Sequence, residues 1–207
     1  MKKLFLLICF IAGLQLSAQN DETFVNEQVT QFTSKLESRG ISQWFTTKRF
    51  CLGSIEMFQM ENGRMCTSRG TYYEVYVVWE EEGTTMLKKI DNCGLFYSIP
   101  LKTNELTEFV TANFTDLEQN SVRPYKAVNI TGKPESRTEV HACRRAYTFR
   151  NNGAEFQQAF KMYDLTTSDK NPNTNFEYNN ALKIISLDRK LDAIIDNLQT
   201  KFKRQKQ

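Results

Sequence analysis

Histidine is almost absent from the 207-residue chain, which contains only His141. Histidine is the commonest metal ligand and proton carrier near neutral pH, so its scarcity narrows the chemistry open to the protein. The sequence also contains no glycine-rich phosphate loop, no Gly-x-Ser-x-Gly and no His-Glu-x-x-His motif. We therefore expect a protein that is not an enzyme and that holds no cofactor and no metal.

Long apolar runs are absent too, except at the N-terminus. Two lysines there precede an apolar run from Leu4 to Leu14, and small residues end at Ala18. This order of a positive end, a short apolar core and small residues is typical of a secretory signal peptide. The run is shorter than the about 20 residues needed to span a bilayer. We expect a signal peptide over residues 1–18 and a single globular domain over residues 19–207.

The N-terminal stretch resembles the signal peptides of exported proteins from Gram-negative bacteria. The resemblance covers about the first 20 residues, and it implies export without indicating an activity. Removal of Lys2 and Lys3 lowers the formal net charge from +3 to +1. A nearly neutral chain has no overall attraction to nucleic acid. We expect a secreted or periplasmic protein without a transmembrane segment, whose partner is a protein or an envelope glycan.

Cysteine is scarce, with five residues in the chain, and Cys9 lies inside the expected signal peptide. The remaining even number indicates two disulfides in an exported chain, formed by Cys51, Cys66, Cys93 and Cys143. Loop length favours Cys51–Cys66 with Cys93–Cys143, because the shorter loop closes most easily. A two-residue turn at Asn62-Gly63 would oppose this pairing, because Cys66 would then face Gln59, far from Cys51.

His141 and Cys143 are two residues apart in a stretch of strand character, so their side chains would point to one face. They could approach one ligand, but a zinc site would need two further ligands. In an oxidising compartment Cys143 is better explained as half of a disulfide beside a partly exposed histidine. We therefore predict neither a metal ion nor a nucleophilic cysteine at this place.

Hydrophobic periodicity predicts three amphipathic helices, one near each end of the mature chain and one between them. Apolar residues recur at helical spacing over Asp21–Arg39, Thr103–Leu117 and Ser186–Phe202. Gly40 follows the first of these stripes, as glycine commonly does at the end of a helix.

Strand character dominates the stretch from Gln43 to Leu101. A turn centred on Glu82-Gly83 would place Trp79 opposite Met86 and Val75 opposite Ile90. We expect the strand before this turn to face the core with Tyr73, Val75, Val77 and Trp79.

Further strands are expected in the second half of the chain. One long strand ends at the Asn152-Gly153 turn, and a short strand covers Ala181–Ile185. The segment 154–163 fits either a strand or a helix, because its aromatic residues have helical spacing but follow a hairpin-like turn. The sequence thus predicts an α+β fold, with a mostly antiparallel sheet of about six strands and N-terminal, central and C-terminal amphipathic helices.

One group of residues is a candidate ligand-binding site. Tyr72 and Tyr76 flank Glu74 on the face opposite Trp79, where exposed aromatic rings and a carboxylate could bind a sugar, although aromatic residues on strands more often pack under a helix. We predict a non-catalytic, disulfide-stabilised binding or structural domain of the cell envelope. The alternative is a carbohydrate-active hydrolase that uses the carboxylates of Glu74 and Glu80.

Overall fold

The computed structural model describes residues 21–127 and 142–206, so the expected signal peptide and His141 lie outside the described residues. The fold is α+β, as predicted, and is built on an antiparallel sheet with the order β6-β5-β4-β1-β8-β9, in which β7 also pairs with β5. Its strands are β1 (Gln43–Cys51), β4 (Tyr73–Glu81), β5 (Thr84–Asp91), β6 (Gly94–Leu95), β7 (Ile99–Pro100), β8 (Cys143–Asn151) and β9 (Ala154–Lys161). A separate hairpin is formed by β2 (Met57–Gln59) and β3 (Met65–Thr67).

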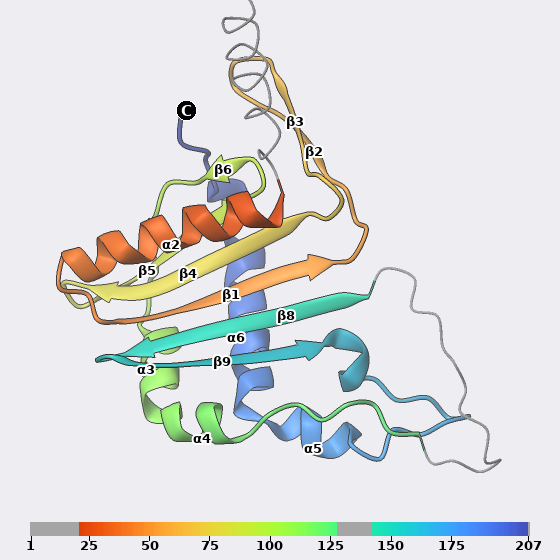
Figure 1. Cartoon of the computed structure of the whole chain (residues 1–207). Helices are drawn as coiled ribbons and strands as arrows, with labels where there is room; N and C mark the ends of the chain where they lie inside the picture. The colour runs from red at the N-terminus through yellow and green to blue at the C-terminus, as the bar shows by residue number, and fades with distance from the viewer. Residues whose placement is uncertain (1–20, 128–141, 207) are drawn as a thin grey trace, which may run out of the picture.

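Helices cover both faces of the sheet (Figure 1). Helix α2 (Glu22–Ser38) lies across one face, over β4 and β5, and α6 (Lys183–Leu198) crosses the other face. The shorter helices gather towards the β9 side: α3 (Glu105–Ala112), α4 (Phe114–Gln119) and α5 (Phe176–Ala181). Each face has its own apolar core, so the central strand β4 is buried on both sides.

The register of the β4–β5 hairpin confirms the prediction. Val75 lies opposite Ile90 and Trp79 lies opposite Met86. Glu82 and Gly83 both have positive φ, at 50° and 74°, as a two-residue hairpin turn requires. The predicted core face is buried beneath α2 and consists of Tyr73, Val75, Val77 and Trp79.

The first predicted helix is confirmed with nearly its expected bounds. The Asp21 side chain accepts a hydrogen bond from the backbone N–H of Phe24 at 2.9 Å and so caps α2. Gly40 has a φ of 81°, which glycine adopts without strain. The central helix is divided at Asn113 into α3 and α4.

The predicted short strand over Ala181–Ile185 is wrong, because this segment is the junction of two helices. Leu182 is extended between α5 and α6, and α6 begins at Lys183. Ile184 and Ile185 pack into the core with the rest of the α6 stripe, so helical tertiary contacts outweigh the strand propensity of isoleucine. The ambiguous segment 154–163 forms β9 and then the 3₁₀ turn η2 (Met162–Leu165).

All four predicted cysteines form disulfides, but the favoured pairing is wrong. Cys51 bonds Cys143, its direct partner across β1 and β8, and Cys66 bonds Cys93. The pairing follows from the order of the strands, because β1 lies beside β8. The length of the loop between two cysteines does not reveal which strands are neighbours. The turn between β2 and β3 is one residue longer than a two-residue turn, so Cys66 faces Phe58.

Helices long and apolar enough to cross a membrane are absent from the two described ranges.

Candidate functional site

The structure divides the three predicted ligand-binding residues between a surface groove and the core. Tyr72 and Glu74 are partly exposed, whereas Tyr76 is fully buried under α6. For Tyr76 the alternative of an aromatic residue packed under a helix applies, because α6 covers this face of the sheet. Tyr76 still belongs to the site indirectly, since its hydroxyl donates a hydrogen bond of 3.0 Å to Glu74.

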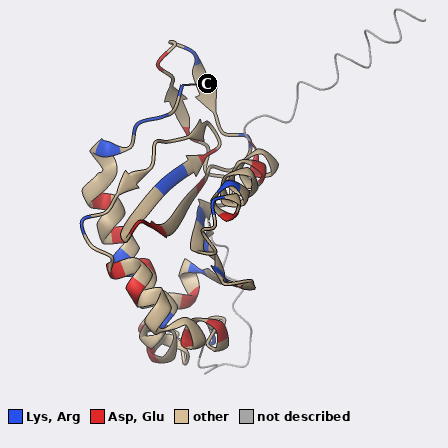
Figure 2. Cartoon of the chain, turned by 90° about the vertical axis from the view of Figure 1, so that its left-hand side faces the viewer, with Lys and Arg blue, Asp and Glu red and all other residues tan. Residues whose placement is uncertain are grey.

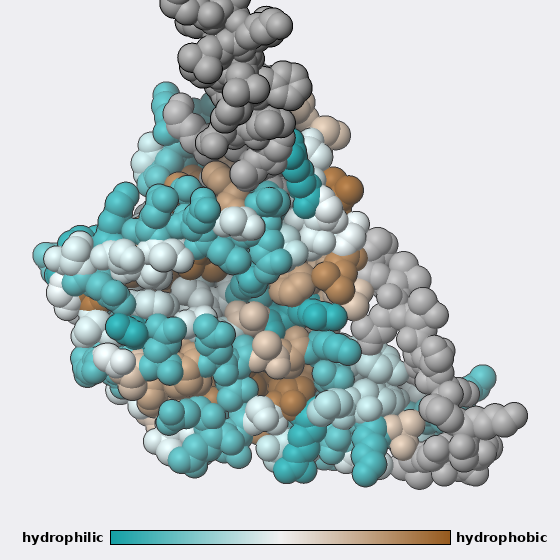
Figure 3. Space-filling view, in the orientation of Figure 1, coloured by the Kyte–Doolittle hydropathy of each residue, from teal (hydrophilic) through white to brown (hydrophobic). Residues whose placement is uncertain are grey.

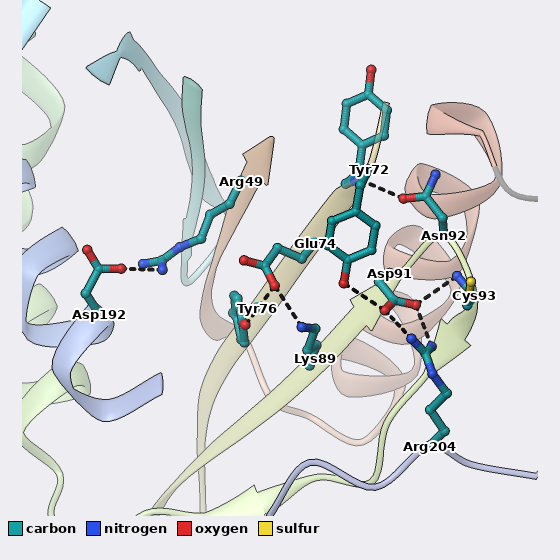
Figure 4. A network of polar contacts seen from close by, with 11 residues as sticks. Arg49, Tyr72, Glu74, Tyr76, Lys89, Asp91, Asn92, Cys93, Asp192 and Arg204 are labelled. Atoms are coloured by element: carbon teal, nitrogen blue, oxygen red, sulfur yellow. Dashed lines mark hydrogen bonds and ion pairs between the residues drawn. The ribbon is translucent and has the colours of Figure 1, made fainter. Parts of the chain in front are cut away.

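Glu74 and Asp91 organise a polar network on this face of the sheet (Figure 4). The Lys89 ammonium donates to Glu74 Oε2 at 2.7 Å, and the Tyr72 hydroxyl donates to Asp91 Oδ2 at 3.0 Å. Lys89 and Asp91 are both on β5, beside β4, so the cross-strand pairing brings these groups together.

Asp91 is the centre of the network, and its fully buried carboxylate has several donors. The two terminal guanidinium nitrogens of Arg204 donate to it, at 2.6 Å and 2.5 Å, and the Cys93 backbone N–H donates at 2.8 Å. A buried carboxylate is tolerated only when it is paired and hydrogen-bonded. This ion pair therefore fastens the C-terminal segment to the sheet.

The segment that carries Arg204 extends the sheet edge. Tyr97 N–H donates to the Lys203 carbonyl at 2.9 Å, and Gln205 N–H donates to the Leu95 carbonyl at 2.8 Å. Residues 203–205 therefore run antiparallel to the chain around Phe96. Figure 2 shows the C-terminal end beside the β2–β3 hairpin, with Lys and Arg along it.

A groove of about 860 Å³ lies between the hairpin and the C-terminal segment. Its aromatic lining consists of Phe58, Tyr72, Phe96 and Phe202. Its charged lining consists of the cations Lys89, Lys203, Arg204 and Lys206 and the carboxylates Glu61 and Asp91. The Arg204 guanidinium lies 4.9 Å from the centre of the Phe58 ring and 4.3 Å from that of Phe96, so it connects the two walls.

The hairpin wall is held by the Cys66–Cys93 disulfide, which joins β3 to the turn after β5. Phe58 lies on the same side as Cys66 and packs against Tyr72, with ring centroids 5.4 Å apart. The opposite side of the hairpin and the segment before it expose Ile55, Met57 and Met65. In Figure 3, hydrophobic surface, coloured brown, is visible at the right of the molecule, where the chain runs from β1 towards the hairpin.

A second polar cluster joins α6 to the sheet away from the groove. The Tyr147 hydroxyl donates to Asp188 at 2.5 Å, and Arg49 pairs with Asp188 at 3.3 Å and also with Asp192. Asp188 and Arg49 are both buried. Burial and the Asp188 charge raise the pKa of the Tyr147 phenol. We assign this cluster to the packing of α6.

The groove is better suited to binding than to proton transfer. Burial raises the pKa of Tyr72 and Tyr76, and the neighbouring carboxylates raise it further, so both phenols stay protonated at neutral pH. Glu74 and Glu80 are six residues apart on β4, which corresponds to about 20 Å along a strand. Glycosidase carboxylates lie about 5–10 Å apart, so this pair cannot flank one glycosidic bond.

Comparison with known protein families, curated proteins and solved structures found no match for the chain. In residues 21–127 and 142–206, no cluster of three His, Cys, Asp or Glu side chains could hold a metal ion.

Sequence reasoning missed the residues that the rest of the chain brings to Tyr72. The helix predicted over Ser186–Phe202 would have placed Arg204 just beyond a helix end. The helix instead ends at Leu198, and Phe202 and Arg204, two residues apart, both line the groove. That period of two was the available signal for an extended segment.

Proposed function

We propose that the protein is an exported, non-catalytic binding domain of the cell envelope, stabilised by two disulfides, and that it binds a partner in the groove between the hairpin and the C-terminal segment. The observation that carries the proposal is the aromatic and cationic lining of this groove, with Tyr72 in its wall. Aromatic and arginine side chains are enriched where proteins bind one another.

The structure offers a direct test by site-specific cross-linking. A photo-reactive residue replaces Gln59, which lines the groove, in the full-length chain expressed in a Gram-negative host. The matched control carries the same residue in place of Glu155, which is exposed on β9 at the other edge of the sheet.

The proposal predicts a discrete cross-linked species from position 59 in the envelope fraction and none from position 155. Equal cross-linking from both positions, or none from position 59, would contradict it.

A further inference from the structure

The groove is bordered by two strand edges whose backbone groups are unpaired. On either side of β2, Met60 N–H donates to the Arg64 carbonyl and the Glu56 carbonyl accepts from Ser68 N–H, so the even-numbered residues of this strand bond β3. Because backbone groups alternate along a strand, the N–H and C=O of Gln59 point outward from the hairpin. The groove is lined by β2 and its turn and not by β3, so this edge faces the groove.

The C-terminal segment presents the opposite edge. Lys203 and Gln205 supply the backbone bonds to the chain around Phe96. By the same alternation, the N–H and C=O of Arg204 point away from β6. Among the described residues, neither Arg204 nor Gln59 has a backbone partner on its outward side. Unpaired strand edges readily accept a further strand.

The size of the groove fits one extended segment. A strand occupies about 4.8 Å between its neighbours, about 10 Å in thickness and about 3.3 Å per residue, or about 160 Å³ per residue. A groove of about 860 Å³ therefore has room for about five residues in extended conformation.

The lining indicates the chemistry of the occupant. Its aromatic side chains would receive alternate side chains of an added strand. Arg204 is paired with Asp91, and Lys89 with Glu74. The Lys206–Glu61 pair, at 4.0 Å, is highly exposed and therefore weak. Within the described ranges, Lys203 lies in no ion pair, so the groove carries surplus positive charge.

We propose that the groove binds an extended, acidic segment of a partner protein, which inserts as a β-strand between β2 and residues 203–205. This inference rests on the proposed binding function and specifies its ligand. The added strand would hydrogen-bond Gln59 on one side and Arg204 on the other, and would make the hairpin continuous with the main sheet.

The probes are fluorescent eight-residue peptides in which valine alternates with glutamate, and a matched set with lysine in place of glutamate. Binding to the oxidised mature protein is measured by fluorescence anisotropy. We expect the glutamate peptide to bind at least tenfold more tightly than the lysine peptide. N-methylation of the glutamate peptide should abolish binding, because it removes backbone donors.

Two matched pairs of variants test the placement of the strand. Gln59→Pro removes the N–H that faces the groove, and Met65→Pro removes an N–H on the far edge at the directly opposite position. Lys203→Glu reverses the surplus charge, and Lys201→Glu changes an exposed residue outside the groove. We expect at least tenfold weaker binding for Gln59→Pro and fivefold for Lys203→Glu, against less than twofold for the controls.

Equal affinity for both peptides would overturn this inference, and so would equal losses of affinity in Lys203→Glu and Lys201→Glu. These two charge variants keep the inference testable if a proline variant fails to fold. Cross-linking from position 59 without peptide binding would refute the acidic strand and leave the proposed function standing. Absence of both would remove the two proposals together.

Discussion

At the scale of the residue, Lys88 is a lysine buried on the face of the sheet that α2 covers. Its side chain is buried, its ammonium donates to the Phe96 carbonyl at 2.5 Å, and it lies 4.9 Å from the centre of the Phe32 ring. Burial, together with the nearby Lys35 charge, lowers the pKa of Lys88 to about 8. In the unfolded chain the same amine keeps its ordinary pKa near 10.4.

This lowered pKa predicts a rise in stability with pH. Between about pH 8 and pH 10 the unfolded chain holds a proton on Lys88 that the folded protein has released, so the free energy of unfolding increases. Relative to Lys88→Met, the wild-type value should gain about 2 kcal/mol from pH 7 to pH 10. Urea denaturation across this range measures the difference. Lys183→Met, at an exposed position, should follow the wild type, and parallel curves for all three proteins would show that Lys88 is not the source.

The buried Arg204–Asp91 pair predicts that removal of one charged partner destabilises the fold more than removal of both. Arg204→Gln leaves the fully buried Asp91 carboxylate without its charge partner, so we expect a loss of about 3 kcal/mol in the free energy of unfolding. The double variant Arg204→Gln/Asp91→Asn should recover much of it. Lys206→Gln, whose side chain is 84 % exposed, should cost less than about 0.5 kcal/mol. Equal losses for Arg204→Gln and Lys206→Gln would contradict the assigned role of the pair.

At the scale of the element, two hairpins use the same turn with different residues. Glu82-Gly83 and Asn152-Gly153 both have positive φ at each position, and asparagine tolerates that conformation better than glutamate. Glu82→Asn should therefore raise the free energy of unfolding by about 0.5–1 kcal/mol, and Asn152→Glu should lower it by a similar amount. Thermal and urea unfolding measure both. Shifts of the same sign in the two variants would mean that contacts outside the turn decide the effect.

The elements also show how far the sequence alone leads. Local patterns predicted α2 and the β4–β5 register, because an apolar stripe and a turn glycine act over a few residues. The disulfide partners depended on β1 lying beside β8, which no local pattern encodes. Tyr72 was identified, but the opposing wall of its groove comes from residues 202–206, more than 120 positions later.

At the scale of the whole molecule, the disulfides connect segments that are distant in sequence. Cys51–Cys143 spans 92 residues and fixes β1 against β8, and Cys66–Cys93 spans 27 and holds the hairpin beside the groove. In the chain-entropy picture each bridge stabilises the fold by about 4 kcal/mol. The two disulfides form and persist only in an oxidising compartment. The expected signal peptide over residues 1–18 would direct the chain to such a compartment.

Export and oxidation together predict the N-terminus and the disulfide links of the mature protein. Protein recovered from the periplasm or medium should begin at Gln19 and contain no free thiol, because we expect cleavage after Ala18 and because the four remaining cysteines are paired. Trypsin places each cysteine in a separate peptide, so a non-reducing digest should join residues 50–64 to 138–144 and residues 65–69 to 90–102. Intact mass and peptide mapping measure both features. An exported species that retains Met1 would refute the predicted cleavage. A link between residues 50–64 and 65–69 would refute the disulfide pairing, because Cys51 would then be bonded to Cys66 across the base of the hairpin and not to its partner on β8.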